Sequence, residues 1–257
     1  MTASGVPAKP KGVAVELTGV RKSYGGHAVL RGVDLSVAPG ELVAIVGQSG
    51  TGKSVLLRQI IGLERPDAGR ILVGGIELPR YLAIPPEEKP FRIAMVFQGA
   101  ALLASLTVAE NVGLRLRERR RHSEREIAEI TRRVLEQVEL AGVEDKLPSD
   151  LSGGMRKRVA IARALAVGPE LILYDEPTAD LDPILTEQIG ELIARIRSTR
   201  GSTQMIVTHN LPLARAIATR IAVLDEGRIA ECVTPAELTA SRHPLTREFL
   251  RASALEG

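Results

Sequence analysis

The stretch that decides the fold is "LVAIVGQSGTGKSVLLRQIIGL", residues 42–63. It joins a short apolar run, residues 42–46, to a glycine-rich turn and then to apolar residues at helical spacing. A short run that is apolar throughout indicates a strand buried on both faces. We therefore predict a strand, a phosphate-binding loop and a helix, in that order.

The glycine-rich turn "GQSGTGKS" matches the P-loop pattern in the structural context that this pattern requires. Its glycines allow backbone torsions closed to other residues. Backbone N–H groups and the positive end of the helix then face anionic oxygens. The lysine reaches the β- and γ-phosphates, and the final serine helps to hold Mg²⁺. The predicted nucleotide-binding residues are Gly47, Gln48, Ser49, Gly50, Thr51, Gly52, Lys53 and Ser54.

Two adjacent carboxylates end a second buried strand, in "LILYDEPTADLD", residues 171–182. Side chains alternate along a strand, so Asp175 and Glu176 are predicted to point in different directions and to have separate roles. Asp175 is predicted to hold Mg²⁺, as the acid of a Walker B strand does. Glu176 is predicted to polarise the water that attacks the γ-phosphate.

Three further residues are candidates because of where they stand. Gln98 and His209 each follow an apolar strand, and the carboxyl ends of strands in such a sheet converge on the ligand crevice. We predict that both sense the γ-phosphate and Mg²⁺, with Gln98 among the nucleotide and metal ligands and His209 in a catalytic role. Tyr24, in "RKSYGG", is predicted to stack its ring against the base.

Short apolar runs alternate with helical patterns along the chain, which predicts a parallel α/β sheet. Residues before the P-loop alternate in polarity and predict a small antiparallel sheet at one edge. From about residue 99 to 160 the pattern is helical. The predicted fold is a P-loop NTPase parallel-sheet core with an N-terminal antiparallel β subdomain and an inserted α-helical subdomain. The apolar runs are residues 42–47, 92–97, 171–176, 205–209 and 221–227.

Composition excludes several classes of protein. Only 2% of the 257 residues are aromatic, so the core must be Leu, Val, Ile and Ala. No apolar run is long enough for a transmembrane helix, and the single cysteine, Cys232, excludes an internal disulfide. Residues 1–12 predict a disordered tail and not a signal peptide, so we expect a cytoplasmic protein. The net charge of +3 is slight, and the basic cluster 115–125 predicts a solvated helix face. No nucleic-acid partner is expected.

The stretch "LSGGMRKR", residues 151–158, contains no acid, nucleophile or metal ligand, and alone it predicts only a helix N-cap at Ser152. Together, however, the motifs resemble the ATP-binding cassette (ABC) family from about Val13 to Phe249. The resemblance implies an A-loop at Tyr24, a Q-loop at Gln98, a D-loop at residues 179–182 and a switch histidine at His209. It also implies that this stretch binds the γ-phosphate held by a second copy of the chain, so that two chains close around two ATP. The signature residues are Ser152, Gly153 and Gly154.

Within that family the chain is most similar to the ATPase subunits of Mla/Mce-type phospholipid transporters. The similarity lies in "MVFQGAALLASLTVAENVGLRL", in "DEPTADLDPI" and in Met155, where most cassettes have Gln. It implies phospholipid trafficking powered from the cytoplasmic face of the inner membrane by a peripheral ATPase. The implied partners are a second copy, an integral membrane permease, an Mce-type substrate-binding protein and accessory subunits. Gln48, Asp180 and Asn210 depart from the usual residues of this group.

Two alternatives stay open. One is a cassette ATPase of another transporter, for amino acid import, lipoprotein release or efflux. The other is a soluble cassette ATPase that acts on DNA or ribosomes, against which stand the single set of motifs and the absence of a long coiled-coil insertion between Walker A and the signature.

Two segments have two possible partners each. The apolar segment 99–112 is predicted to dock a membrane subunit, the alternative being that it packs inside the helical subdomain. The tail 243–257 is predicted to be an amphipathic helix, because Leu245 and Phe249 share a face. It packs either on its own domain or on the partner ATPase.

Overall fold

The computed structural model describes residues 12–255, with side chains up to residue 251. At the centre of this range is a six-stranded sheet in which β9, β3, β8, β7 and β6 are parallel and β10 is an antiparallel edge strand. Its strands, in spatial order, are β10 (Arg228–Val233), β9 (Arg220–Asp225), β3 (Leu42–Val46), β8 (Thr203–Thr208), β7 (Leu171–Asp175) and β6 (Ile93–Val96). The predicted parallel sheet is confirmed.

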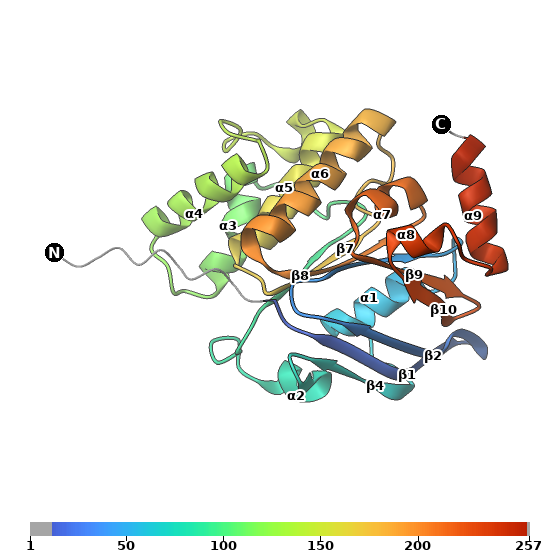
Figure 1. The fold of residues 1–257 in the computed structure, drawn as a ribbon. Coiled ribbons are helices and arrows are strands. Elements are labelled where there is room, and N and C mark those ends of the chain that lie inside the picture. The colour runs from blue at the N-terminus through green and yellow to red at the C-terminus, as the bar shows by residue number, and fades with distance from the viewer. Residues whose placement is uncertain (1–11, 256–257) are drawn as a thin grey trace.

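A second, antiparallel sheet of four strands lies below the first in Figure 1, with α1 (Lys53–Ile61) between the two sheets. In spatial order its strands are β2 (His27–Val37), β1 (Val15–Tyr24), β4 (Ala68–Val73) and β5 (Ile76–Glu77). This is the predicted antiparallel β subdomain. The pattern before the P-loop indicated β1 and β2 only, because β4 and β5 come after α1.

Helices cover the other face of the parallel sheet (Figure 1). The remaining helices are α2 (Leu78–Ala83), α3 (Val108–Glu118), α4 (Glu124–Gln137), the 3₁₀ turn η1 (Pro148–Asp150), α5 (Gly153–Ala166), α6 (Pro183–Arg200), α7 (Leu211–Ile217), α8 (Pro235–Leu238) and α9 (Pro244–Leu255). Within residues 12–255, no helix is long and apolar enough to cross a bilayer.

Strand β3 is buried on both faces, as its apolar run predicted. Val43 and Ile45 pack in the core that contains α1 and the antiparallel sheet. Ala44 and Val46 face the opposite core, which α3 to α7 cover. The P-loop is therefore fixed to a strand that is buried along its whole length.

The helical segment after β6 forms one packed group of α3, α4 and α5. Both α3 and α4 begin with a reciprocal capping box, in which a hydroxyl and a glutamate satisfy each other's backbone N–H groups. The pairs are Thr107 with Glu110 and Ser123 with Glu126. These caps fix where α3 and α4 start. For the helical subdomain as a whole, we propose the boundaries indicated by the sequence, residues 99–160.

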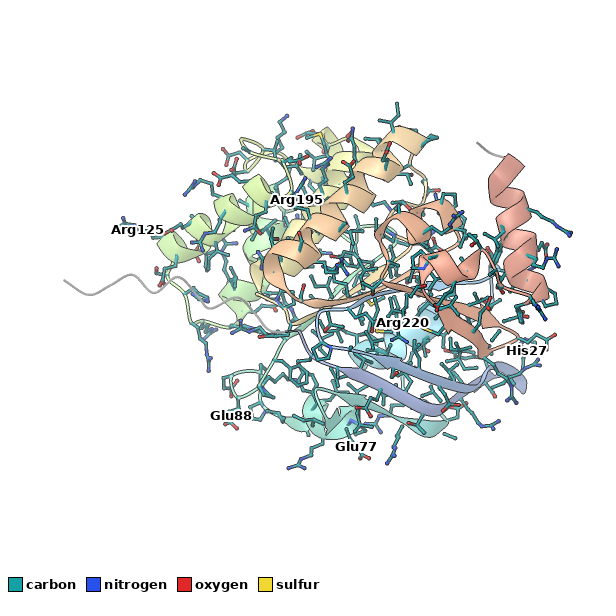
Figure 2. All side chains as sticks on the ribbon, in the orientation of Figure 1. His27, Glu77, Glu88, Arg125, Arg195 and Arg220 are labelled. Carbon is teal, nitrogen blue, oxygen red and sulfur yellow. The ribbon has the colours of Figure 1, made fainter. Side chains whose placement is uncertain are left out.

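The basic cluster 115–125 lies on this group and carries its own counter-charges. Arg115 pairs with Glu118 at 3.0 Å, and Arg117 pairs with Glu124 at 3.0 Å. Arg125 points outward from the rim of α4 (Figure 2). The observed ion pairs support the interpretation as a solvated helix face.

Strand β10 was not predicted from the sequence. It follows β9 through a tight hairpin in which Glu226 and Gly227 both have positive φ, 43° and 75°. Two such residues match the twist of antiparallel strands. In the sequence, this turn was included in the apolar run 221–227, because glutamate is not a residue type that indicates a left-handed turn.

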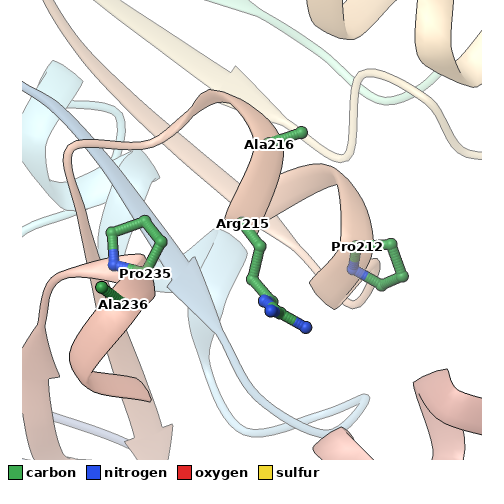
Figure 3. Close-up of a pocket in the computed structure, with 5 residues that line it drawn as sticks. All are labelled: Pro212, Arg215, Ala216, Pro235 and Ala236. Atoms are coloured by element: carbon green, nitrogen blue, oxygen red, sulfur yellow. The ribbon is translucent and has the colours of Figure 1, made fainter. Parts of the chain in front are cut away.

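The hollow shown in Figure 3 has a volume of about 570 Å³ and lies between α7 and α8. Its lining is Pro212, Arg215, Ala216, Pro235 and Ala236. None of the predicted site residues lines it.

The chain ends differ in how much is described. Of the predicted tail 1–12, residues 1–11 lie outside the described part of the chain, while the Gly12 N–H donates to the Gly201 carbonyl at 2.9 Å. The C-terminal segment forms α9, where Leu245 is buried and Phe249 packs partly against the protein's own core. This supports packing of the tail on its own domain.

Deleting residues 243–257 is therefore expected to destabilise the monomer. The loss of Leu245 and its neighbours from the core should cost about 2–5 kcal/mol, which lowers the melting temperature by about 5–15 °C. Calorimetry of the truncated chain tests this, with the exposed Arg247→Ala as a control on the same helix. An unchanged melting temperature combined with impaired assembly would show instead that the tail serves the partner subunit.

Candidate nucleotide site

Four predicted site segments begin where neighbouring parallel strands end. Val46 lies opposite Thr208, Asp175 opposite Val207, and Val96 opposite Tyr174. The P-loop, the two carboxylates, the Q-loop and the switch histidine thus leave the sheet at the same edge. In an open α/β sheet this edge is where ligands bind.

The P-loop is closed by Gly52, the N-cap residue of α1. Gly52 has φ 98°, and a Cβ there would lie 2.8 Å from Val29 Cγ1, so no other residue fits. No side chain caps α1. The N–H groups of its first turn are therefore available to an anionic ligand, together with the positive end of the helix.

Gly47 is required for a different reason from the one predicted. Its backbone is not in the left-handed region. A Cβ would lie 2.5 Å from the Leu224 carbonyl oxygen, a backbone atom that has no room to move. The loop needs glycine here because β9 passes too close, and not because of an unusual torsion. Gln48, Ser49 and Gly50 form the exposed tip of the loop.

Lys53 is the buried cation of the loop. It is 6% exposed, and its Nζ donates to the carbonyl oxygens of Gly47 at 2.8 Å and Gln48 at 2.9 Å. Burial lowers the pKa of Lys53, while the charges of Glu176 and Asp175 raise it and so oppose that effect. Its charge therefore lies among carbonyls and carboxylates, at the start of α1.

Ser54 and Asp175 form the candidate Mg²⁺ site. The Ser54 hydroxyl donates to Asp175 Oδ1 at 2.6 Å, which places a hydroxyl and a carboxylate oxygen side by side at the sheet edge. No group of three or more His, Cys, Asp or Glu side chains in the described residues forms a metal cage. The donor set fits Mg²⁺, which takes one or two protein oxygens and completes its shell with water and phosphate.

Glu176 does not continue strand β7, although the prediction from strand alternation assumed that it does. Strand β7 ends at Asp175, and Glu176 has φ 45°, in the left-handed region that non-glycine residues rarely adopt. Its N–H still donates to the Val207 carbonyl at 3.0 Å, and its carbonyl accepts from Ala179. Asp175 thus lies in the strand, whereas Glu176 lies in a left-handed turn after it.

His209 contacts the carboxylate of Glu176. Its Nδ1 lies 3.0 Å from Glu176 Oε2, while the rest of the ring is largely exposed. The His209 N–H also donates to Glu176 Oε2, at 3.4 Å, so both contacts from His209 fall on the same carboxylate oxygen. The two predicted catalytic residues are thus brought together.

Gln98 is exposed just beyond β6, and its carbonyl accepts a hydrogen bond from Lys157 Nζ. Sequence reasoning missed Lys157, which is 7% exposed in α5. The spacing in the sequence could have indicated that Lys157 is buried, because it shares a helix face with the buried Ala160 and Ile161. A lysine on an apolar face needs a buried acceptor, and the Q-loop carbonyl is one.

The signature residues begin α5. The Ser152 hydroxyl accepts from the Met155 N–H at 3.3 Å, so the N-cap predicted from the sequence is present. Ser152 is exposed, and a Cβ on Gly153 would approach only Leu181, at 3.7 Å. At this helix end Ser152 is exposed and Gly153 is half-buried, whereas Gly154, the third signature residue, is buried.

Tyr24 ends β1 and is 45% exposed, as a ring that is to receive a base must be. Its hydroxyl donates to the carboxylate of Glu64. Glu64 was also missed, since 40 residues separate the partners.

A protein-family model for ABC transporters matches residues 30–179, more than half of the chain. The chain belongs to the ABC transporter family. As a cassette of this family it is an ATPase that uses ATP and Mg²⁺. The matched range contains the P-loop, the Q-loop, the signature residues and both carboxylates.

Three relatives resemble this cassette over almost its whole length. It is 40% identical to Protein TRIGALACTOSYLDIACYLGLYCEROL 3, chloroplastic, of Arabidopsis thaliana, over 94% of the chain and 74% of that protein. It is 38% identical to the Probable ribonucleotide transport ATP-binding protein mkl of Mycobacterium leprae, over 94% and 70%. It is 41% identical to the L-cystine transport system ATP-binding protein TcyN of Escherichia coli, over 95% and 99%.

The fold of this cassette also matches solved structures. The dimeric, post-hydrolysis ATP-binding cassette MJ0796 bound to ADP and Pi has a TM-score of 0.76 and 34% identity, covering 86% of this chain and 98% of that one. CbiO1 of Clostridium perfringens, part of the transporter complex cbiONQ, has a TM-score of 0.78 and 28% identity, covering 94% and 96%.

Proposed function

We propose that this ABC ATPase powers phospholipid trafficking as a peripheral subunit on the cytoplasmic face of the inner membrane. The observation that carries the ATPase role is the placement of Lys53, Ser54, Asp175 and Glu176 at one sheet edge. The lipid cargo is supported by the 40% identity to a relative whose name refers to a glycolipid.

The residues divide the work on ATP between them. The P-loop N–H groups and Lys53 bind the β- and γ-phosphates. Ser54 and Asp175, with Gln98, would hold Mg²⁺, and the ion would supply positive charge to offset that of the phosphate oxygens. Glu176 accepts hydrogen bonding from the attacking water and polarises it, and His209 holds Glu176 in place.

The signature residues serve the nucleotide of a second copy. Helix α5 packs in one core, whereas the P-loop helix α1 packs in the other, on the opposite face of the parallel sheet. The outward-facing N-terminus of α5 then contributes position and partial positive charge to the partner's γ-phosphate. ATP bridges two chains, and hydrolysis removes the bridge. The dimeric cassette of similar fold supports this arrangement.

ABC ATPases pair with membrane permease subunits, and we propose residues 99–112 as the docking segment of this chain. Arg163 donates to the carbonyls of Ala101 at 2.6 Å and Ala100 at 2.8 Å. The Asn111 side chain bonds the Leu103 N–H at 2.8 Å and three carbonyls at 3.0 Å. The backbone is held rigidly while Leu103 stays 47% exposed. An Mce-type substrate-binding protein and accessory subunits complete the proposed complex.

Leu103→Glu is expected to release the ATPase from membranes, because docking would bury an unpaired charge. The membrane-bound fraction should fall at least about tenfold. Leu102 is a poorer probe than the sequence suggested, since it packs partly against the core. Leu63→Glu, at an exposed leucine after α1, is the matched control. If membrane association survives Leu103→Glu, the docking segment is wrong.

Amino acid import is the second candidate, favoured by the 41% identity to the L-cystine transport protein over nearly the full length of both chains. Purification of the tagged ATPase from membranes, with whatever permease accompanies it, separates the two. The complex is reconstituted and ATP hydrolysis is measured with phospholipid or with L-cystine added. Stimulation by phospholipid supports the proposal, and stimulation by L-cystine alone overturns it.

A further inference from the structure

Tyr24 is connected to the end of the P-loop helix through the side chain of Glu64, which has no assigned role in binding the nucleotide. The Tyr24 hydroxyl donates to Glu64 Oε2, and Glu64 lies in the turn that ends α1. The Glu64 and Leu63 N–H groups both donate to the Arg58 carbonyl, at 3.2 and 2.9 Å. Glu64 is therefore fixed to the end of α1 by its backbone.

The side chain of Glu64 is fixed as well. Arg58 Nε lies 2.8 Å from Glu64 Oε1, so the two carboxylate oxygens are divided between Arg58 and Tyr24. Burial raises the pKa of Glu64, but the hydrogen bonds from Tyr24 and Arg58 outweigh it and leave the pKa below its ordinary value. Glu64 is consequently a charged acceptor, which makes a stronger hydrogen bond than a neutral one.

A second set of bonds holds the end of β1 to the same turn. Lys22 Nζ lies 2.9 Å from Asp67 Oδ1, and the Ser23 N–H donates to Asp67 Oδ2 at 2.7 Å. The Asp67 N–H donates back to the Arg21 carbonyl at 2.9 Å. The backbone under Tyr24 is thus fixed independently of Glu64. Lys22 Nζ also lies 5.5 Å from the centroid of the Tyr24 ring, and Glu64 acts on that ring through the hydroxyl at its far end. His27, which pairs with Tyr24 across the hairpin, marks this corner in Figure 2.

We propose that Glu64 is a positioning residue that sets the Tyr24 ring as the platform for the nucleotide base. The inference rests on the proposed nucleotide role of Tyr24. Helix α1 then fixes both ends of the substrate, the phosphates through Lys53 at its start and the base through Arg58 and Glu64 at its end. The Tyr24 hydroxyl serves Glu64 and not the nucleotide, which explains tyrosine in place of phenylalanine.

The test compares ATP with inorganic tripolyphosphate, which lacks a base, by calorimetric binding to the full chain. Tyr24→Ala should weaken ATP binding about 5- to 150-fold, the usual worth of a stacked base. Tyr24→Phe and Glu64→Ala should each weaken it about 3- to 10-fold, as loss of one side-chain hydrogen bond typically does. The double variant should be no weaker than either of these two, because both remove the same bond. Tripolyphosphate binding should not change.

Kinetics and a conservative variant separate positioning from support of the fold. Glu64→Ala should raise KM for ATP with a smaller change in kcat, and Glu64→Gln, which keeps an acceptor oxygen, should recover part of the loss. Glu88→Ala removes an exposed acid elsewhere and should leave both constants unchanged. If Tyr24→Phe and Glu64→Ala bind ATP as the wild type does while Tyr24→Ala binds weakly, the positioning role of Glu64 is overturned. The base role of Tyr24 then stands. Normal binding by Tyr24→Ala overturns the base role of Tyr24 itself. Equal losses for ATP and tripolyphosphate in Glu64→Ala would assign Glu64 to the fold only.

Discussion

Lys53→Ala is expected to abolish tight ATP binding. The substitution removes the one charge that the P-loop directs at the β- and γ-phosphates. Loss of a buried charge from a hydrogen-bonded pair costs about 2–5 kcal/mol. The dissociation constant for ATP should therefore rise by a factor between about 30 and several thousand. Titration calorimetry with Mg²⁺ and ATP measures the change.

The fold should tolerate this substitution. Lys53 Nζ bonds only the loop's own carbonyls, at 2.8 and 2.9 Å, and burial already disfavours its charged form. The melting temperature without nucleotide is expected to stay near that of the wild type. Lys146→Ala, at an exposed lysine of the helical segment, controls for the loss of one positive charge. An unchanged dissociation constant in Lys53→Ala would count decisively against the P-loop assignment.

Glu176→Gln is expected to slow ATP hydrolysis by about 10²–10⁴-fold, the usual worth of a positioned general base. Glutamine keeps the size of the side chain but not its basicity. ATP binding should persist, since Glu176 contacts His209, whereas the P-loop carbonyls accept from Lys53. Phosphate release at saturating ATP, measured beside the dissociation constant, separates the two effects.

The same variant should accumulate as an ATP-bound dimer, because the bridge between chains is removed only by hydrolysis. Gel filtration with and without ATP reports the change in size. Turnover within a few-fold of the wild type would rule out Glu176 as the base and would direct attention to another acceptor at the same edge.

The local parts of the site were predictable from sequence. The P-loop, the strand before it and the helix after it occupy 22 consecutive residues, from Leu42 to Leu63, and their pattern decides the structure without help from elsewhere. The antiparallel strands β1 and β2 carry an equally local signal, which is alternation in polarity. Convergence of the strand ends followed from the parallel topology, which places Asp175 beside β8.

What sequence did not predict depends on distant partners or on backbone conformation. Tyr24 finds Glu64 across 40 residues, and Lys157 finds the Gln98 carbonyl across 59. The left-handed backbone of Glu176 likewise has no sequence signal, because the surrounding sheet imposes it. Alternation along β7 therefore did not predict that the strand ends at Asp175 and that Glu176 adopts a left-handed conformation.

The bonds from α5 to the segment after β6 have a mechanical consequence. Arg163 holds the carbonyls of Ala100 and Ala101, and Lys157 holds that of Gln98, so three successive points of the segment are attached to one helix. We therefore expect a tilt of α5 to move this segment, which bears Leu103, together with the helix. In the proposed complex, we expect the displacement of a partner at Leu103 to follow the rotation of α5 and not flexing of the loop.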